Sequence, residues 1–351
     1  EVGLVSVHRR DFLAEREDEI VLDRLVHEKV VGRDAGLARI DALSPHCAFC
    51  CKSNVRTLVY DAGAFPAKLQ RDGSQKPGGA FHDELADFYA AEQMMRGLIK
   101  MASGRKRWFA PSLRMVIGIP SGSTEVEIRA VRDSAEHAGG REVYMVFEPM
   151  AAAIGVGMDV LAPEGNMIVD IGGGTTEIAV ISLGGIVSNK SIKMAGDDLT
   201  NDIVEYMRRQ HNIRVSERMA ERIKINVGSA LSILEDAPED FEVCGPNQMT
   251  ALPMKVPVSY QEIAHCLDKS ISKIEAAVLS ALEQTPPELY ADIVKNGIYL
   301  AGGGALLRGI DKRLRDKMGI EFHVADDPLH AVARGTGIAL KNIDKFNFLI
   351  R

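Results

Sequence analysis

Asp170-Ile-Gly-Gly-Gly-Thr-Thr-Glu177 separates two apolar segments, 167–171 and 178–182, and this stretch decides the fold of the chain. Two apolar runs around a glycine turn predict a β-hairpin. Consecutive glycines can expose backbone N–H groups to phosphate oxygens with no side chain in the way. Asp170, at the strand end, is placed to hold Mg²⁺ through water, and the Thr175 and Thr176 hydroxyls can donate to a phosphate. The alternative is a plain hairpin whose glycines only permit positive φ.

A second triplet, Gly302-Gly303-Gly304, follows an apolar run at 297–301. We expect it to open a helix over 305–318, which would place a helix N-terminus beside a bound phosphate or nucleoside. Two strands that each end in a glycine triplet predict two lobes closing on one nucleotide. Neither triplet belongs to a Walker A loop or to a Gly-x-Gly-x-x-Gly unit.

The chain from residue 86 onward alternates between strand and helix patterns, which predicts an α/β protein with helix-covered sheets. Strands are expected at 115–119, 144–147, 167–171, 178–182, 186–192 and 297–301. Helices are expected at 90–101, 124–137, 150–157, 199–210, 216–227, 260–283 and 305–318. The polar, proline-rich segment 235–257 shows short β-like patches.

The composition excludes several classes of protein. The 42 basic and 49 acidic side chains give a net charge of −7, and no block of Lys and Arg offers a surface for nucleic acid. Five cysteines, with Cys47, Cys50 and Cys51 close together, do not suggest a secreted disulfide framework, so the cytosol is the expected compartment. No apolar run reaches the ~18 residues of a spanning helix, so any membrane contact is expected to be peripheral.

Four segments resemble the MreB family of bacterial actin homologues, and the resemblance runs from Ala86 to about Leu340. They are Phe147-Glu-Pro-Met-Ala-Ala-Ala-Ile-Gly155, the glycine hairpin from Asn166 to Gly185, Ala220-Glu-Arg-Ile-Lys224 and Leu300-Ala-Gly-Gly-Gly-Ala-Leu-Leu-Arg-Gly309. The resemblance implies an actin-like ATPase fold, in which two lobes with ribonuclease-H-like cores surround a cleft for ATP and Mg²⁺. It further implies that residues 86–148 complete lobe I with a membrane loop. Lobe II would follow at 149–340 with a small inserted subdomain at about 190–258, and 341–351 would be a C-terminal tail.

The resemblance also assigns site residues. Glu148 would orient and polarise the attacking water, Asp170 would be the magnesium-side acid, and Gly172, Gly173 and Gly174 with Thr175 would form the second phosphate loop. The adenosine would lie on Glu221, Arg222, Ile223 and Lys224, and the second triplet with its neighbour would close over the nucleoside and α-phosphate: Gly302, Gly303, Gly304 and Ala305. Two alternatives remain: Glu148 could cap the helix that starts at Pro149, and Glu221 with Lys224 could be a surface ion pair.

The function implied by the resemblance is a nucleotide-dependent cytoskeletal protein. Its homopolymeric filaments, expected as paired protofilaments, would lie on the inner face of the cytoplasmic membrane, organise cell-wall synthesis with other shape proteins and maintain rod shape. Trp108 and Phe109 follow three cations and suit an interfacial membrane anchor, unless Trp108 packs on the core. Other candidates are a small-molecule kinase of the actin superfamily, such as a sugar kinase, and an interaction protein that binds no nucleotide.

Residues 1–85 do not match the resemblance. An Asp-x-Gly-Thr-type first phosphate loop is expected there, and the nearest string, Tyr60-Asp-Ala-Gly-Ala-Phe-Pro66, lacks a hydroxyl partner. ATP hydrolysis is therefore an open question for this chain. The segment is either a diverged N-terminal domain or a translation out of frame that rejoins the proper frame near Ala86. In the first case His46 with Cys47, Cys50 and Cys51 could form half a zinc site, although no second ligand pair is visible.

Overall fold

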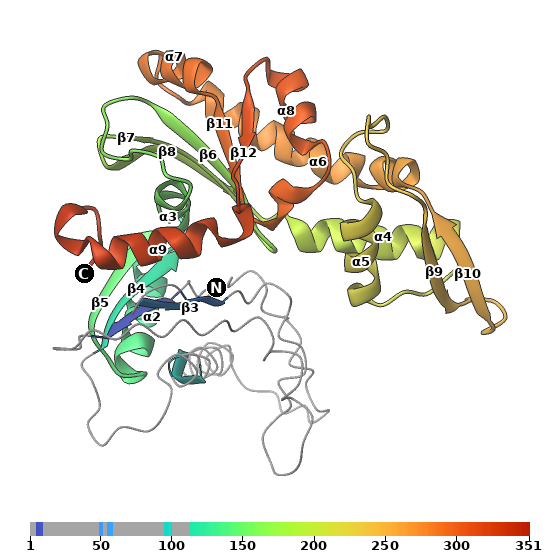
Figure 1. Ribbon diagram of the computed structural model, residues 1–351, viewed down its shortest axis with the longest axis horizontal. Coiled ribbons are helices and arrows are strands. Elements are labelled where there is room, and N and C mark those ends of the chain that lie inside the picture. The colour runs from blue at the N-terminus through green and yellow to red at the C-terminus, as the bar shows by residue number, and fades with distance from the viewer. Residues whose placement is uncertain (1–4, 10–48, 52–54, 59–94, 98, 100–112) are drawn as a thin grey trace, which may run out of the picture.

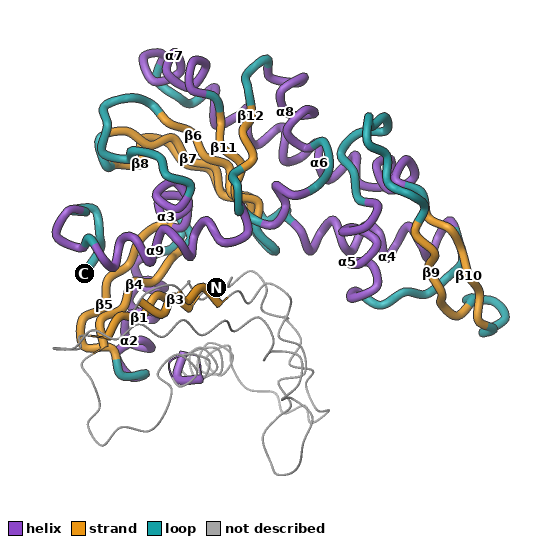
Figure 2. The backbone as a smooth tube through the Cα atoms, in the orientation of Figure 1, coloured by secondary structure: helices purple, strands orange, loops and turns teal. Residues whose placement is uncertain are grey.

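The computed structural model describes residues 5–9, 49–51, 55–58, 95–97, 99 and 113–351. Within these ranges the chain forms two five-stranded sheets and a separate two-stranded hairpin (Figure 1). Helices cover the sheets and also lie between them, as the tube in Figure 2 shows. The predicted α/β architecture is therefore confirmed. None of the described helices is long and apolar enough to cross a bilayer.

The second sheet in chain order has the strand order β12-β11-β6-β7-β8. Its strands are β6 (Asn166–Ile171), β7 (Thr176–Ser182), β8 (Gly185–Ile192), β11 (Ile298–Ala301) and β12 (Phe322–Val324). The first three form an antiparallel meander, and β11 and β12 continue the sheet in parallel with β6. The glycine hairpin predicted from the sequence is thus the turn between β6 and β7.

The first sheet has the order β2-β3-β1-β4-β5. Its strands are β1 (Val5–Arg9), β2 (Phe49–Cys51), β3 (Val55–Leu58), β4 (Leu113–Ile119) and β5 (Gly140–Phe147). No strands are expected before residue 86 from the sequence, because no apolar run there is followed by a glycine turn. Since β4 and β5 are parallel, their carboxyl ends share one edge.

The central strand β1 distinguishes the first sheet from the second. It runs antiparallel to β4, with Val5 beside Ile117 and Arg9 beside Leu113. In the second sheet the corresponding central pair, β6 and β11, is parallel. The carboxyl end of β1 therefore lies at the edge where β4 begins, opposite the edge where β4 ends. A phosphate loop directly after β1 would lie at the edge where β4 begins, whereas it would have to lie at the opposite edge to face the β6–β7 turn.

The described helices of regular α type follow the prediction for most of the chain. They are α2 (Glu125–His137), α3 (Glu148–Gly155), α4 (Gly196–Gln210), α5 (Glu217–Val227), α6 (Tyr260–Glu283), α7 (Pro287–Asn296), α8 (Ile310–Met318) and α9 (Ala331–Lys341). The hairpin of β9 (Phe241–Pro246) and β10 (Pro253–Val258) lies beside α5, far from the first sheet (Figure 1). The predicted capping box of Thr124 and Glu127 begins α2.

One helix prediction was wrong. The segment expected to be helical from residue 305 to 318 is a short 3₁₀ turn, Gly303–Leu306, followed by α8 from Ile310. Gly309 separates the two in the left-handed conformation, with φ 72°. The predicted end of the helix at residue 283 is confirmed, and Pro287 then begins α7, which the sequence did not predict, because proline is tolerated in the first turn of a helix.

Helices α3 and α9 form a layer between the two sheets (Figure 1). One buried cluster joins α3 to Val116 of β4, to Ile168 of β6 and to Leu340 of α9. The two helices cross with backbones in contact: a Cβ on Gly155 would lie 1.8 Å from the Ala331 oxygen. Only glycine permits such an approach. The crossing fixes α9, which packs on the first sheet, against α3, which packs on strands of both sheets.

Side chains alternate between the two faces of the second sheet. On β6, Val169 belongs to the core formed with α4 to α8, whereas Ile168 faces α3 and α9. On β7, Ile178 and Ala179 divide in the same way. By this alternation the residues at 170 and 177 lie on the face toward α3 and the first sheet.

Candidate functional site

The two glycine triplets meet at one edge of the second sheet. Ala301 of β11 lies beside Asp170 of β6, so the turns that follow these parallel strands are neighbours. Gly302 has a φ of +79°, and a Cβ there would lie 2.4 Å from Oδ1 of Asp170. A Cβ on Gly304 would lie 2.3 Å from Cγ2 of Ile171. The second turn therefore fits against the strand end only because it is built of glycine.

The first triplet lies under the N-terminus of α4. Gly172 closes its own turn by donating its N–H to the Thr175 carbonyl at 2.9 Å. Gly196 and Asp197, in the first turn of α4, donate their N–H groups to the carbonyls of Gly172 (3.0 Å) and Gly173 (2.8 Å). The helix end expected at the second triplet is thus found at the first. It belongs to an element about 20 residues further along the chain, which sequence spacing alone did not reveal.

The two threonines after the first triplet differ. Thr176 is fully buried, and its hydroxyl donates to the Met194 carbonyl at 2.7 Å. Its single O–H is used in this way, so the expectation that Thr176 donates to a phosphate was wrong. Thr175 is half-buried, and its side chain has no hydrogen bond to any residue that the structure describes. Thr175 is therefore the better candidate for a phosphate contact.

Glu221 and Lys224 of α5 face the start of α4. Nζ of Lys224 contacts Oε2 of Glu221 at 2.7 Å, the Gly196 carbonyl at 2.7 Å and the Thr200 hydroxyl at 2.9 Å. The Thr200 hydroxyl also lies 2.7 Å from Glu221. The pair is mostly buried, with side chains 14% and 21% exposed for Lys224 and Glu221, so it is no solvated surface pair. It holds α5 against the helix end that lies on the first triplet.

The other two residues of that segment point elsewhere. Ile223 is fully buried in the core of the second sheet. The exposed Arg222 places its guanidinium carbon 5.7 Å from the ring centre of Phe241 on β9. Their side chains are used in packing, and Ala305, 3% exposed, is likewise a core residue.

Glu148 begins α3 directly after β5 and is half-buried. The residue in the N-cap position is Phe147, and the helix has no side-chain cap, so the alternative in which Glu148 is the cap does not apply. Because β4 and β5 are parallel, Glu148 and the residues after β4 share the carboxyl edge of the first sheet.

Ser121 and Glu177 bring that edge to the second sheet. Ser121 follows β4, and Glu177 lies on β7 opposite Asp170 in the strand pair. The Ser121 hydroxyl donates to Oε2 of Glu177, and the Ser121 N–H donates to the same oxygen at 3.3 Å. Neither residue was predicted from the sequence to have a role. The sequence feature that could have indicated a role is the position of Glu177, a carboxylate directly before the apolar run 178–182.

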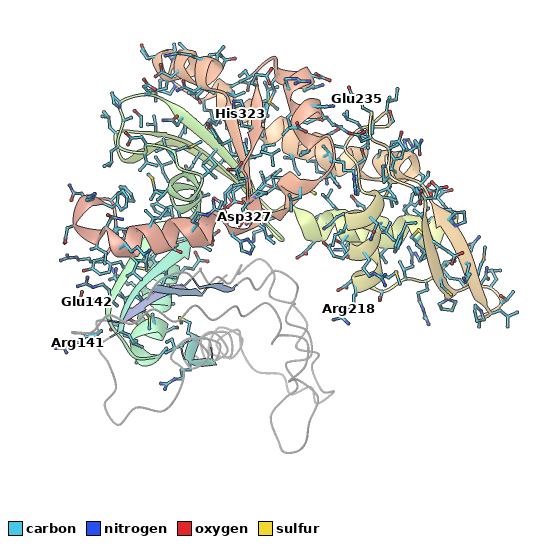
Figure 3. All side chains as sticks on the ribbon, viewed as in Figure 1. Arg141, Glu142, Arg218, Glu235, His323 and Asp327 are labelled. Carbon is cyan, nitrogen blue, oxygen red and sulfur yellow. The ribbon has the colours of Figure 1, made fainter. Side chains whose placement is uncertain are left out.

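The segment before α9 supports the second triplet. Gly302 donates its N–H to the Pro328 carbonyl at 2.8 Å. Asp327, labelled in Figure 3, contacts Nδ1 of His330 at 2.7 Å and Nη2 of Arg334 at 3.1 Å. Burial raises the pKa of Asp327, but the hydrogen bond and charge of His330 together with Arg334 outweigh it and lower that pKa. Arg334 also donates to the Gly155 carbonyl at 3.1 Å and so links the triplet to the helix crossing.

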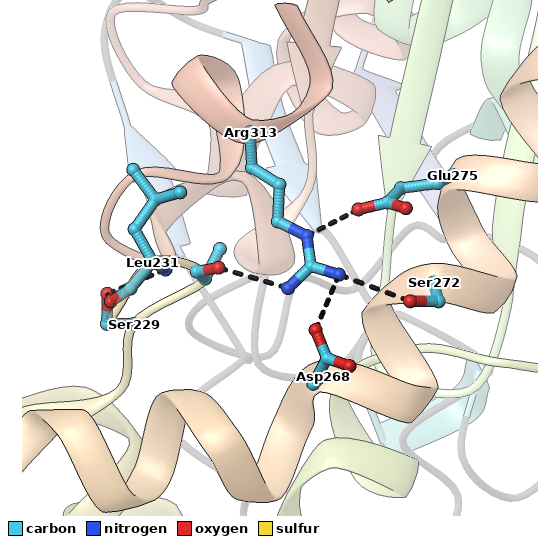
Figure 4. A network of polar contacts seen from close by, with 7 residues as sticks. Ser229, Leu231, Asp268, Ser272, Glu275 and Arg313 are labelled. Carbon is cyan, nitrogen blue, oxygen red and sulfur yellow. Dashed lines mark hydrogen bonds and ion pairs between the residues drawn. The ribbon is translucent and has the colours of Figure 1, made fainter. Parts of the chain in front are cut away.

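Arg313 of α8 secures the segment after α5 (Figure 4). Its guanidinium contacts Glu275, Asp268 (2.9 Å) and the Ser272 hydroxyl (3.2 Å), all on α6. It also donates to the Ala230 carbonyl at 3.1 Å. This network joins α8, α6 and the segment after α5 through one rigid guanidinium group.

Several predicted residues lie outside the described ranges. These are Trp108 and Phe109, the string 60–66, and His46 with Cys47; of Cys50 and Cys51 only the strand position is described. In the ranges that the structure describes, no three His, Cys, Asp or Glu side chains group as a metal site would require.

Known proteins resemble this chain over about three quarters of its length. A sequence profile of the MreB/Mbl protein family matches residues 82–348. The cell shape-determining protein MreB of Escherichia coli K12 is 45% identical over 260 residues, 74% of each chain. The cell shape-determining protein Mbl of Bacillus subtilis 168 is 42% identical over 262 residues, 74% of this chain and 77% of the relative.

Solved structures agree with the sequence comparisons. MreB5 of Spiroplasma citri bound to AMPPNP is 36% identical with a TM-score of 0.69, covering 74% of this chain and 77% of that one. A double helical filament of MamK is 19% identical with a TM-score of 0.59, covering 73% of this chain and 76% of that one. The second likeness concerns the fold alone.

Proposed function

Because the chain belongs to the MreB/Mbl family and has its actin-like fold, we propose that it is a cell-shape protein that binds ATP where its two sheets meet and assembles into filaments. The observation that carries this proposal is the fit of Gly302 and Gly304 against Asp170 and Ile171. Two adjacent glycine turns, with a positive helix end on one of them, let phosphates approach the backbone with no side chain in the way. The related MreB5 was crystallised with AMPPNP and with ADP.

The residues present fit a nucleotide with Mg²⁺. Asp170 is 7% exposed at the end of β6 and offers the carboxylate oxygens that Mg²⁺ prefers, and Thr175 adds a hydroxyl. When bound, Mg²⁺ would neutralise phosphate charge. We assign to Glu148 the role of orienting the water molecule that attacks the terminal phosphate. Glu221 and Lys224 would contact one side of the adenosine, and the turn from Gly302 to Gly304 would cover the opposite side.

The filament and membrane parts of the proposal rest on the family. We assign to the chain homopolymeric filaments, with protofilaments in pairs, at the inner face of the cytoplasmic membrane. There they would organise cell-wall synthesis together with other shape proteins. Trp108 and Phe109, which follow Arg105 to Arg107 in the sequence, would be the membrane anchor. One weak anchor per subunit becomes effective when a filament repeats it.

ATP hydrolysis is a separate part of the proposal. No first phosphate loop is recognisable in residues 1–85, and β1 ends at the edge of its sheet away from the end of β4. We therefore expect the chain to bind ATP through the glycine turns of the second sheet and to hydrolyse it slowly. Translation of the coding sequence in all three frames tests the origin of the segment. An Asp-x-Gly-Thr string in another frame upstream of Ala86 supports a frame change, and its absence supports a diverged domain.

The deciding experiment is ATP-dependent sedimentation with anionic liposomes. Glu148→Ala should slow phosphate release while filaments still pellet, because the binding residues remain. Trp108→Ser should reduce the fraction bound to liposomes while polymerisation without lipid persists. The control is Tyr290→Ser, which removes an aromatic of α7 that is 39% exposed and far from the proposed anchor in the sequence. Absence of nucleotide binding and of pelleting in the wild type would refute the proposed function.

A further inference from the structure

Glu177 carries a buried carboxylate for which neither the fold nor the proposed nucleotide contacts account. It is 2% exposed and forms no ion pair within the part of the chain that the structure describes. A carboxylate at such a position is costly unless hydrogen bonds satisfy its oxygens. Asp170 lies directly opposite on β6, and like charges so placed repel, which raises that cost further.

Three donors satisfy the Glu177 carboxylate, and they come from both sheets. From the first sheet, Ser121 donates its hydroxyl and its N–H to Oε2, the latter at 3.3 Å. From the second sheet, the hydroxyl of Ser191 on β8 donates to Oε1. Asn189, also on β8, donates its side-chain N–H to the Ser121 carbonyl at 3.4 Å. Ser121 is therefore held by two strands of the opposite sheet.

The position of this contact gives it a consequence for ligand retention. On one side, Ser121 follows the strand whose neighbour β5 leads into Glu148. On the other side, Glu177 is paired with Asp170, the residue before the first glycine turn. Any separation of the two carboxyl edges must break the hydrogen bonds between Ser121 and Glu177. A ligand held between the edges leaves faster when they separate more easily.

We propose that Glu177 is a positioning residue that holds the carboxyl edges of the two sheets together through Ser121 and so sets how slowly a bound nucleotide leaves. The inference rests on the proposed function, because the ligand is the nucleotide assigned there. The contact acts on the separation of the sheets and touches no phosphate. Its loss therefore changes dissociation more than association.

The test uses the full chain and the dissociation of a fluorescent ATP analogue, chased with excess ATP in a stopped-flow instrument. Ser121→Ala and Glu177→Gln should each speed dissociation about tenfold, the effect of one hydrogen bond to a charged group, with little change in association. The double variant should be no faster than the faster single variant, because both changes act on one contact: Ser121→Ala removes the hydroxyl donor and Glu177→Gln removes the charge of the acceptor. Ser121→Thr keeps the hydroxyl and should restore slow dissociation.

Two serines of β8 serve as matched controls. Ser191→Ala removes a hydrogen bond to the same carboxylate without removing a contact between the sheets, so dissociation should change less than about twofold. Ser188→Ala removes a hydroxyl that has no hydrogen-bond partner among the described residues and should change nothing. Ser121→Ala alters only a half-buried side chain, so it tests the inference even if Glu177→Gln fails to fold.

The outcomes separate the inference from the proposed function. A wild-type chain that binds the analogue, with Ser121→Ala as slow to release it as wild type, would overturn the inference alone. Equal acceleration by Ser191→Ala and Ser121→Ala would also overturn it, since the carboxylate would then act within the second sheet. A wild-type chain that binds no analogue would refute the proposed function and the inference together.

Discussion

Gly335 of α9 lies against the backbone of α3 so closely that a Cβ on it would be 1.7 Å from the Ala151 oxygen, while Gly155 has the reciprocal contact with Ala331. Neither helix can shift sideways at this point without opening the layer that joins the two sheets. Backbone contact of this kind tolerates no added atom, which leads to the first prediction.

Gly335→Ala should destabilise the protein by about 3 kcal/mol or more, because the new methyl group must push two backbones apart. Chemical denaturation followed by circular dichroism measures the change. Gly122→Ala is the control, since a Cβ there meets nothing within 4 Å and should change stability by less than about 1 kcal/mol. Equal effects of the two substitutions would contradict the assigned crossing.

The second triplet gives a matched pair of substitutions. Gly302→Ala combines a positive φ with a Cβ 2.3 Å from the Ile171 oxygen, so it should abolish binding of a fluorescent ATP analogue and lower the melting temperature. Gly303→Ala meets only the flexible end of Leu329 at 3.2 Å and should retain most of the affinity. Titration of both variants with the ATP analogue measures the two affinities. A normal affinity for Gly302→Ala would show that this turn does not contribute to nucleotide binding.

The two cysteines whose side chains the structure describes, Cys244 and Cys266, should differ in reactivity. Burial, with smaller contributions from Asp202 and Glu262, raises the pKa of the Cys266 thiol to about 12. At pH 8 only about one in ten thousand such thiols is ionised, so alkylation there should be very slow. Cys244 is exposed and should react first. Peptide mapping after timed iodoacetamide treatment gives both rates, and the reverse order would contradict the packing of α6.

Asp327 predicts an acid dependence of stability. Its pKa is lower in the folded chain than the ordinary value, so its contribution is complete above about pH 4 and disappears as the pH falls through the lower folded pKa. With the side chain 48% exposed, solvent screening should keep the contribution below about 1 kcal/mol. Thermal melts between pH 6 and 3 should show a shallower pH dependence for Asp327→Asn than for wild type, and parallel curves would contradict the assignment.

The site was partly predictable from the sequence because glycine triplets after apolar runs have a local physical meaning. Asp170 and both triplets lie at strand ends, as predicted, and they lie close together. The inference that the two triplets mark two separate lobes was wrong, because both follow strands of one sheet, β6 and β11. The helix whose N–H groups donate to the carbonyls of the first triplet was not predictable from the sequence. The N-terminus of α4 reaches Gly172 through tertiary packing, and nothing local in the sequence marks that contact.

The missed elements have identifiable causes. Helix α9 contains Gly335 and Gly337, which lower helix propensity, yet it forms because it packs on α3. The strands before residue 86 gave no pattern of apolar runs with glycine turns. Strand β1 is paired on both sides, with β3 and β4, so its place depends on long-range partners.

The position of α9 in the chain also bears on how the protein folds. Arg334 and Gly155, which touch across the helix crossing, are 179 residues apart in the sequence. Contacts at such separation form slowly, because the intervening chain must first be brought into register. The ribosome synthesises residues 331–341 after all the described strands of both sheets, so the second sheet can assemble its outer core before the layer between the sheets is complete. A chain without α9 would therefore leave part of the apolar face of β6 and β7 exposed, and the interval before α9 is made is when the protein most needs protection from aggregation.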